Sequence, residues 1–431
     1  ACLDHTFGGK ITSCLVNPRA CHETILIEKP VTTKERIAVV GAGPAGLAFA
    51  TTAARRGLDV TLFDAASEIG GQFNIAKQVP GKEEFYETLR YFRKQIDLAG
   101  VKLELNRKVT AEVLAKEGFK QVVLATGVTP RALDFEGIHH PKVVSYLEVL
   151  RDKCAVGQSV ALIGAGGIGF DTAEFLLHEG ESPSLNAARF FAEWGVDTAY
   201  TTRGGLAAAH IEKSPRKVYL LQRKTTKVGD GLGKTTGWIH RTSLKNRQVE
   251  MINGVTYRKV DDSGLHITVG DKDMTLPVDT VVVCAGQEPQ RELQAGLQAA
   301  GCTVHLIGGA DVAAELDAKR AIKPGTELAL AWGEVKSAAP EAAPGSFEQR
   351  VNPAVAESLK HWHTMVAAKN VAELGSILHP KAVFRSPMAH TPYPSAQAVQ
   401  LILGNVIQVF EDFTYHRELA SADGLSVVLE F

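Results

Sequence analysis

The sequence has few features that would place this protein outside the ordinary globular class. No stretch approaches the roughly 20 consecutive apolar residues that a membrane-spanning helix needs. Lysine and arginine together number 47 and nearly balance the 48 aspartates and glutamates, so no surface for nucleic acid or membrane is expected. Six cysteines among 431 residues are too few for a disulfide-stabilised scaffold. We expect a cytoplasmic protein.

Glycine, by contrast, is abundant, with 40 residues in the chain. Several of these glycines directly follow short apolar segments. From Arg36 onward these segments alternate with helical stretches, which predicts a parallel α/β sheet. One unit of strand, glycine loop, helix and strand occurs twice, about 120 residues apart. The expected helices include 44–57 and 168–179, and the expected strands are 36–40, 59–64, 120–127, 159–164, 217–224, 279–286 and 303–309.

The first glycine loop has the spacing that binds a dinucleotide. Gly41, Gly43 and Gly46 follow one expected strand and precede an expected helix. The first glycine permits a tight turn, the second lets a pyrophosphate approach the backbone, and the third lets helix and strand pack closely. Asp64 ends the next strand, where a carboxylate can accept a hydrogen bond from a ribose hydroxyl. A plain tight turn is the alternative, but the strand, the helix and the acidic residue together favour dinucleotide binding.

The second glycine loop repeats this spacing but lacks the carboxylate. Gly164, Gly166 and Gly169 form the loop, and Arg223 and Lys224 stand at the end of the following strand. A carboxylate there would repel a 2′-phosphate, whereas arginine and lysine would pair with it. The second loop is therefore interpreted as an NADP(H) site, with solvated surface cations as the alternative.

Two segments near this second loop need separate interpretations. The chain between Gly164 and Arg223 is too long for a simple unit, which indicates an insertion near 181–215. The segment 228–236 resembles a phosphate-binding loop, but Val228 stands where that motif requires glycine. We interpret it as an irregular basic loop.

The composition changes at 334–346, where Ala, Pro, Ser and Glu predominate, and this segment is interpreted as a linker. The remaining sequence indicates an α+β pattern and not a continuation of the parallel sheet. It predicts helices at 353–369, 370–378 and 395–413, a strand at 382–387, and two short strands before the end.

The chain resembles flavoproteins of the glutathione reductase type in its two loops and in the motifs LATG (124–127), CAGQEP (284–289) and IGGADVAAELDAKRAI (307–322). It is also similar to the C-terminal half of bacterial 2,4-dienoyl-CoA reductase, through SCLVNPRACHE, GGQFNIAKQVPGKEEFYETLRY, GKTTGWIHRT and LDAKRAI. This resemblance covers residues 1 to about 332. It implies an α/β fold with two dinucleotide-binding domains, one for FAD and one for NADPH.

The resemblance also implies domain boundaries. We expect an iron–sulfur linker remnant at 1–33, a discontinuous FAD domain at 34–140 and 279–332, an NADPH domain at 141–278, a linker at 333–347 and a terminal domain at 348–431.

In that family, a flavin-bearing barrel precedes four cysteines that hold a [4Fe–4S] cluster. The resemblance matches Cys2 and Cys14 to the last two of these cysteines, whereas Cys21 is at no ligand position. A cluster of this kind takes four thiolates, and two cannot hold it. We therefore expect a fragment that lacks the barrel, with its two remaining cluster cysteines unligated.

The implied chemistry is hydride transfer from NADPH to FAD, then single-electron transfer through the cluster to FMN in the missing barrel, where an unsaturated acyl-CoA of fatty acid oxidation would be reduced. The resemblance assigns no catalytic residue to this chain. Three cysteines are interpreted as packing residues: Cys154, Cys284 and Cys302. The "GGAD" at the end of the FAD domain has one residue more than the commoner "GD". By resemblance NADPH would contact Gly164, Gly166, Gly169, Arg223 and Lys224, and FAD would contact Gly41, Gly43, Ala45, Gly46, Asp64, Gly71, Gln72, Lys82, Val109, Gly127 and Asp311.

Residues 348–431 resemble the first two thirds of a SnoaL-like, NTF2-like domain, a cone-shaped α+β fold. The resemblance does not settle function, because that fold serves both enzymes and binding proteins. His361 and His363 are an unlikely metal pair, since positions two apart do not share a helix face. Three other side chains could line a pocket: His390, Tyr393 and Asp412. We expect this domain to be incomplete.

Three alternatives remain open from the sequence. The same electron-input half could serve a barrel that acts on another enoate, an enal or an amine. The flavin core could instead be a non-catalytic module fused to a small-molecule-binding domain, or the two parts could be joined artificially. The sequence predicts no oligomeric state.

Overall fold

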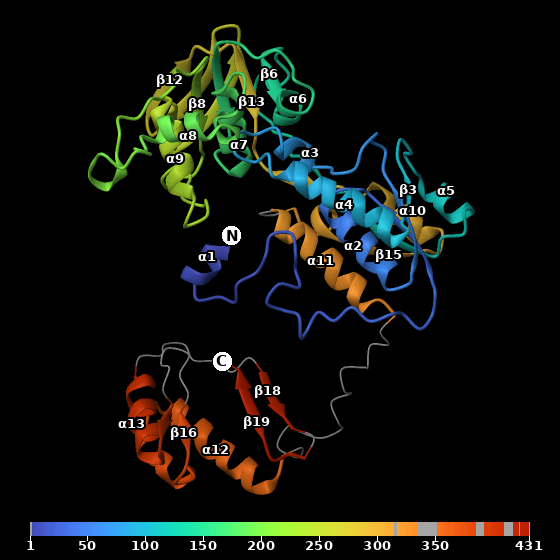
Figure 1. Ribbon diagram of the computed structural model, residues 1–431, viewed down its shortest axis with the longest axis vertical. Coiled ribbons are helices and arrows are strands. Elements are labelled where there is room, and N and C mark those ends of the chain that lie inside the picture. Colours follow the sequence, from blue (N-terminus) through green and yellow to red (C-terminus); the bar gives the residue numbers. More distant parts are fainter. Residues whose placement is uncertain are drawn as a thin grey trace. The chain divides into compact units, whose positions relative to one another are not determined.

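The computed structural model describes residues 2–313, 317–333, 351–384, 392–408, 417–421 and 423–430 (Figure 1). The chain divides into two compact units, Ala1–Gly333 and Glu334–Phe431. Within the first unit, two five-stranded parallel sheets form the cores of two nucleotide-binding domains. The α/β fold expected from the alternating pattern is thus confirmed for this unit.

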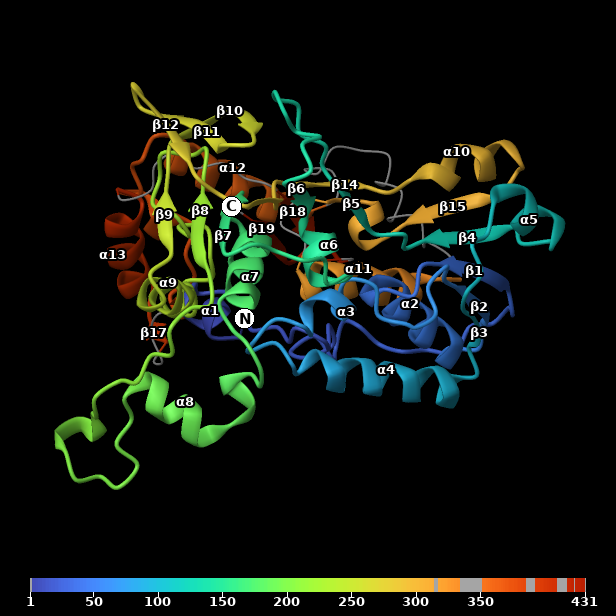
Figure 2. The same ribbon diagram turned by 90° about the horizontal axis from the view of Figure 1, so that it is seen from above.

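The first sheet has the strand order β15-β4-β1-β2-β3, and all its neighbours are parallel. Its strands are apolar on both faces because helices cover both sides (Figure 2). One face is covered by α2 (Pro44–Arg55), α4 (Phe85–Ala99) and α11 (Ala318–Ala331), and the other by α5 (Ala111–Lys116) and α10 (Glu292–Ala299). The strands are β1 (Arg36–Val40), β2 (Asp59–Phe63), β3 (Lys102–Glu104), β4 (Gln121–Leu124) and β15 (Thr303–Leu306).

The second sheet has the order β6-β13-β7-β8-β9 and is also parallel. Helices α6 (Tyr146–Leu150), α7 (Gly167–Leu176) and α9 (Gly237–Asn246) cover one face. A three-stranded antiparallel sheet covers the other face, with strands β10 (Val255–Asp261), β11 (Gly264–Val269) and β12 (Lys272–Leu276). The five parallel strands are β6 (Val143–Ser145), β7 (Ser159–Ile163), β8 (Lys217–Leu221), β9 (Glu250–Ile252) and β13 (Thr280–Val283).

The chain crosses between these two domains along a pair of antiparallel strands, β5 (Val128–Pro130) and β14 (Gln287–Pro289). The segment 279–332 was expected to belong to the FAD domain, but its first strand, β13, lies between β6 and β7 in the second sheet. There it neighbours the strand that leads into the glycine loop, as β4 neighbours β1 in the first sheet. The return to the first domain therefore comes a few residues later than predicted.

The expected insertion lies between α7 and β8. It contains α8 (Ala187–Trp194), which has no buried residue and is set apart from the sheet (Figure 2). Two short 3₁₀ helices, Pro183–Leu185 and Arg203–Gly205, flank α8. The amino-terminal segment, expected to be irregular, begins with a short helix, α1 (Cys2–Phe7). Short helices elsewhere in the chain are α3 (Phe73–Ala76) and the 3₁₀ turns Gly308–Ala310 and Leu374–Ser376.

In its described residues the second unit has two α-helices, α12 (Pro353–Ala367) and α13 (Ala396–Val406), which pack around a small core. The helix expected at 370–378 is wrong, because only a 3₁₀ turn forms there. Two antiparallel strand pairs complete the described part: β16 (Val383–Phe384) with β17 (Tyr393–Pro394), and β18 (Arg417–Ala420) with β19 (Val427–Glu430).

The cone-shaped NTF2-like fold stays a prediction for this unit. Tyr393 lies exposed on β17, whereas His390 and Asp412, the other two expected pocket residues, fall outside the described residues. The linker expected at 333–347 also lies outside them, apart from its first residue. Among the helices that the structure describes, none is long and apolar enough to cross a membrane.

Candidate functional site: two glycine loops

The first glycine loop connects β1 to α2 and needs two of its glycines for steric reasons. Gly41 has a φ of +108°, and a Cβ there would lie 2.3 Å from the carbonyl oxygen of Ala125. A Cβ on Gly46 would lie 1.9 Å from the carbonyl oxygen of Gly41. These two glycines therefore permit the close approach of strand, turn and helix that the sequence predicted.

The second loop, between β7 and α7, repeats this geometry closely. Gly164 has a φ of +111°, and a Cβ there would lie 2.8 Å from the carbonyl oxygen of Cys284. A Cβ on Gly169 would lie 1.9 Å from the carbonyl oxygen of Gly164. The repeated unit in the sequence thus corresponds to a repeated backbone structure.

The middle glycine of each loop is not required by the protein's own packing. A Cβ on Gly43 would meet nothing closer than the Cα of Gly71, at 3.9 Å, and a Cβ on Gly166 would meet nothing within 4 Å. Both residues have negative φ values, so their backbone does not demand glycine. Each is the N-cap of its helix, where free backbone N–H groups favour an anion. The open space beside these two glycines fits the phosphates of a bound dinucleotide.

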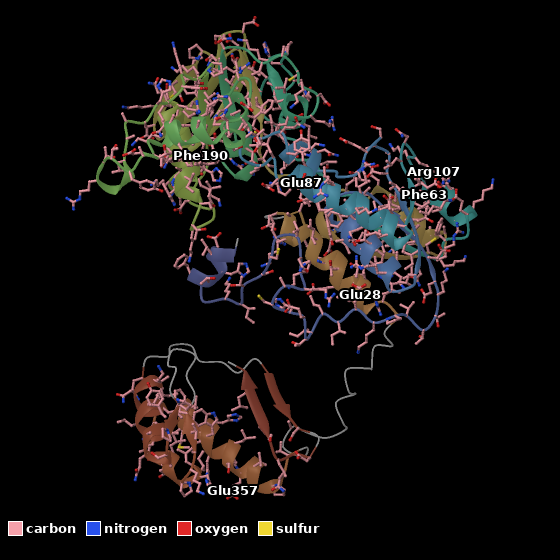
Figure 3. The ribbon with its side chains drawn as sticks, in the orientation of Figure 1. Glu28, Phe63, Glu87, Arg107, Phe190 and Glu357 are labelled. Atoms are coloured by element: carbon pink, nitrogen blue, oxygen red, sulfur yellow. The ribbon has the colours of Figure 1, made fainter. Side chains whose placement is uncertain are left out.

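Asp64 stands directly after β2, beside the first loop. Its carboxylate oxygens accept hydrogen bonds from the backbone N–H groups of Ala42, at 2.6 Å, and Ala66, at 2.8 Å. Next to it, the guanidinium of Arg107 lies over the ring of Phe63, 5.1 Å from the ring centroid (Figure 3). These hydrogen bonds hold the Asp64 carboxylate beside the loop, where it could accept a hydrogen bond from a ribose hydroxyl.

The corresponding position after β8 is basic. Arg223 and Lys224 are exposed and form no ion pair within the described part of the chain. The amide of Gln222 donates to the carbonyl oxygens of Lys224 and Thr226, at 3.1 and 2.9 Å, and so fixes the turn that carries both cations. Unpaired cations at this place fit a phosphate on the ribose.

Lys82, expected at FAD, forms an ion pair within the protein. Its ammonium group contacts both carboxylate oxygens of Asp171, at 2.6 and 2.7 Å. Asp171 lies on α7, two residues after the last glycine of the second loop, so this ion pair joins the two nucleotide-binding domains. Sequence reasoning missed Asp171, although a carboxylate within the otherwise apolar start of α7 was a signal.

The remaining residues expected at FAD lie at several places in the first domain. Ala45 is buried in the first turn of α2, where a Cβ on Gly308 would approach its side chain to 2.7 Å. Gln72 begins α3, Gly127 ends the segment after β4 with a φ of +76°, and Val109 is buried on the opposite face of the sheet. A Cβ on Gly71 would lie 3.0 Å from the Cα of Gly43. Asp311 is exposed, and its carbonyl oxygen accepts a hydrogen bond from Arg291.

The cysteines expected at an iron–sulfur cluster lie in the amino-terminal segment. Among the residues that the structure describes, no group of three or more side chains could hold a metal ion. Cys14 is partly buried, and Cys2 begins α1. The residues present therefore do not fit a complete cluster.

The three cysteines interpreted as packing residues lie in the first unit, and two of them are buried. Burial raises the pKa of the Cys284 thiol to about 12, and this thiol donates to the hydroxyl of Thr172. The Cys302 thiol donates to the carbonyl oxygen of Phe119, and burial raises the pKa of Cys154. Thiols with raised pKa values are poor nucleophiles, in agreement with a packing role.

A buried carboxyl group lies far along α7 from the second loop. Burial raises the pKa of Glu174 to about 7, against the opposing effects of a hydrogen bond from Ser243 and the charge of Arg247. The almost fully buried Arg247 in turn donates to the carboxylate of Glu193 on α8, at 2.8 Å. This cluster attaches the insertion to the second domain, and its place at the last turns of α7 and α9 indicates a structural role.

We expect Glu174→Gln to stabilise the protein at pH 8 and to have little effect at pH 4. The unfolded carboxyl ionises near pH 4.5, but the folded one only near 7, so the folded state holds more protons between these values. The free energy of unfolding therefore falls as pH rises through this window and remains lower above it. Glutamine avoids this loss, which we estimate as about 1–3 kcal/mol at pH 8. Urea denaturation at both pH values measures the effect, and equal changes at the two would contradict it.

Two parallel sheets, each with a glycine loop at the carboxyl end of its central strand, define a two-domain dinucleotide-binding oxidoreductase. Comparison with known families agrees with this class. The chain belongs to the pyridine nucleotide-disulphide oxidoreductase family, whose model matches residues 35–320. Membership implies FAD and a pyridine nucleotide as the bound groups.

Individual relatives are similar to part of the chain. The chain is 32% identical over 316 residues to the metal reductase of Desulforamulus reducens, covering 72% of this chain and 46% of that protein. It is 31% identical over 185 residues to the cinnamate reductase of Clostridium sporogenes, covering 43% and 27%. A solved complex of 2-naphthoyl-CoA reductase with 2-naphthoyl-CoA matches with a TM-score of 0.64 and 27% identity, over 76% of this chain and 45% of that one. This chain thus spans less than half the length of each of these proteins.

Proposed function

We propose that this chain is the electron-input part of a larger flavin reductase, in which NADPH reduces FAD. The observation that carries this proposal is the pair of middle glycines, Gly43 and Gly166, whose open space the protein's own packing does not explain. The carboxylate after β2 supports FAD at the first loop, because it suits a free ribose hydroxyl. Arg223 and Lys224 after β8 support NADPH at the second loop, because they suit a 2′-phosphate.

The chain's own residues would bind and orient the two nucleotides. The N-termini of α2 and α7 would hold the pyrophosphates through backbone N–H groups. The Asp64 carboxylate would accept a hydrogen bond from a ribose hydroxyl. The Lys82–Asp171 ion pair would fix the two domains against each other at their interface. Bound FAD would supply the redox chemistry itself.

In finer detail, we propose that the chain is part of a 2,4-dienoyl-CoA-reductase-like enzyme that reduces an unsaturated acyl-CoA. The family resemblance in the first 332 residues supports it, and the similar 2-naphthoyl-CoA reductase is named for a CoA thioester. Cys2 and Cys14 would be two of four cluster ligands in the whole enzyme, with FMN in a further domain. We derive no step through the cluster, because the residues present do not fit it alone.

A second candidate keeps the same electron input but changes the final acceptor. The similarity to cinnamate reductase, whose name denotes an enoate, supports an enoate acceptor, whereas the similarity to N,N-dimethylglycine/sarcosine dehydrogenase supports an amine. The second unit is proposed to be an NTF2-like small-molecule-binding domain attached to this reductase.

An anaerobic visible spectrum tests the main proposal. The purified chain would be reconstituted with FAD and then treated with NADPH or with NADH. We expect a bound flavin that NADPH bleaches much faster than NADH does. A bound flavin that neither nucleotide reduces would contradict the reductase proposal and favour a binding module.

Replacing both Arg223 and Lys224 by alanine should weaken NADPH selectively. Each cation would lose a charge-assisted contact with the 2′-phosphate, so we expect KM for NADPH to rise by about 10–100-fold. KM for NADH should stay within about twofold, since NADH lacks that phosphate. Stopped-flow reduction of bound flavin measures both, and an equal loss with both nucleotides would place the 2′-phosphate elsewhere.

A further inference from the structure

A groove of about 570 Å³ lies in the second domain, along the face of α9 and beside the edge strand β9. Trp238, Arg241 and Lys245 line it from α9, where spacings of three, four and seven residues place them on one face. Val228 and Met251 add apolar surface. This volume is within the usual range for small-molecule sites.

The charges around this groove are all of one sign. Lys227, Arg241 and Lys245 line it, and no carboxylate does. In the described part of the chain none of the three forms an ion pair, and Arg241 donates only to the carbonyl oxygen of Gly229, at 2.7 Å. Arg241 and Lys245 are also four residues apart on one helix, a like-charge spacing that is unfavourable by itself. An anion in the groove would compensate all three cations.

The aromatic side chain of the groove is fixed but open. The indole N–H of Trp238 donates to the carbonyl oxygen of Thr235, at 3.1 Å, while 54% of the residue remains exposed. An exposed ring held in place by its own polar atom offers a flat surface for stacking. The groove therefore combines a stacking surface with three unpaired cations.

The groove is separate from the glycine loop of its domain. The loop follows β7, whereas the groove lies at β9, and β8 stands between these strands. Neither Arg223 nor Lys224 lines the groove. The groove adjoins the turn after Lys224, because its lining residue Asn253 donates to the carbonyl oxygens of Thr225 and Thr226, at 2.7 and 3.2 Å. The residues assigned to NADPH therefore lie next to the groove but do not line it.

We propose that this groove binds a second ligand, a planar aromatic anion whose ring stacks on Trp238 and whose phosphate, sulfonate or carboxylate pairs with Lys227, Arg241 and Lys245. This site is additional to the proposed electron-input function and does not depend on it. It uses only residues of the second domain.

Anilinonaphthalene sulfonate, an aromatic anion with a planar naphthalene ring, serves as the probe with the full chain. Its binding is followed by dye fluorescence and by quenching of tryptophan. We expect Lys245→Glu to raise Kd at least about tenfold, because repulsion replaces an ion pair. Trp238→Ala should raise Kd and abolish most of the quenching. The matched control is Lys272→Glu, a charge reversal at an exposed position on β12, which should leave Kd unchanged.

Three results would overturn the proposal. The first is no saturable binding of the dye to the folded chain. The second is an equal Kd for Lys245→Glu and Lys272→Glu, with both variants folded by circular dichroism. The third is competitive displacement by NADP⁺, which would assign the groove to the dinucleotide site. Because reduction of flavin by NADPH is measured separately, failure here leaves the electron-input proposal untouched.

Discussion

Substitution of Gly43 by alanine is expected to weaken flavin binding strongly while leaving the protein folded. The new methyl group would meet no protein atom closer than 3.9 Å, and the φ of −77° suits alanine. It would nevertheless occupy the space into which a pyrophosphate must approach the backbone at the N-terminus of α2. We expect a rise in Kd for FAD of at least about 100-fold, which corresponds to about 2.7 kcal/mol. Titration of the flavin-free chain with FAD, followed by flavin fluorescence, measures this change.

Two other glycine variants make this result interpretable. Gly41→Ala would place a methyl group 2.3 Å from a backbone oxygen, so it should destabilise the first domain itself. Gly231→Ala, where a Cβ meets nothing within 4 Å, should change neither stability nor flavin affinity. If Gly43→Ala bound FAD as tightly as Gly231→Ala does, the first loop would not be the flavin site.

The same substitution in the second loop should separate binding from reduction. Gly166→Ala has open space around the new methyl group and a φ of −82°, so the fold and the bound flavin should be retained. The pyrophosphate of NADPH would be displaced from the start of α7, and kcat/KM for flavin reduction should fall at least about thirtyfold, or about 2 kcal/mol. Anaerobic stopped-flow absorbance with NADPH measures this rate.

The two variants together provide a reciprocal check. Gly43→Ala should lose flavin, and Gly166→Ala should keep flavin but lose its reduction by NADPH. If high NADPH concentrations restore the normal rate of flavin reduction in Gly166→Ala, the variant has the expected defect in NADPH binding. Unchanged kcat/KM in Gly166→Ala would instead remove the second loop from the NADPH site.

The parallel sheets could be predicted because their strands are short, apolar and followed by glycine. β1 was predicted with the bounds it has, and α2 ends two residues earlier than expected. Both loops have the tight turn and close helix packing that their spacing indicates. Local sequence determines such turns, because only glycine adopts the backbone at Gly41 and Gly164 without a clash.

Features that depend on distant pairing were harder to predict. The strand β13 has the same pattern of apolar residues followed by glycine as β4, so its local sequence does not indicate which sheet it joins. The ion pair of Lys82 with Asp171 joins residues on different domains, so no spacing rule indicates it. The groove on α9 likewise needs the edge strand beside it, although the helical spacing of its three α9 residues was visible in the sequence.

The split first sheet has a consequence for synthesis of the chain. β4 acquires its outer neighbour, β15, only after about 180 further residues have been made, and α11 comes later still. At a translation rate of about 5–20 residues per second, this delay lasts roughly 10–35 s. During that time β4 is an unpaired apolar edge, the kind of strand that recruits other chains. Expression yield should therefore depend on chaperones that shield the nascent chain until residue 306 has left the ribosome.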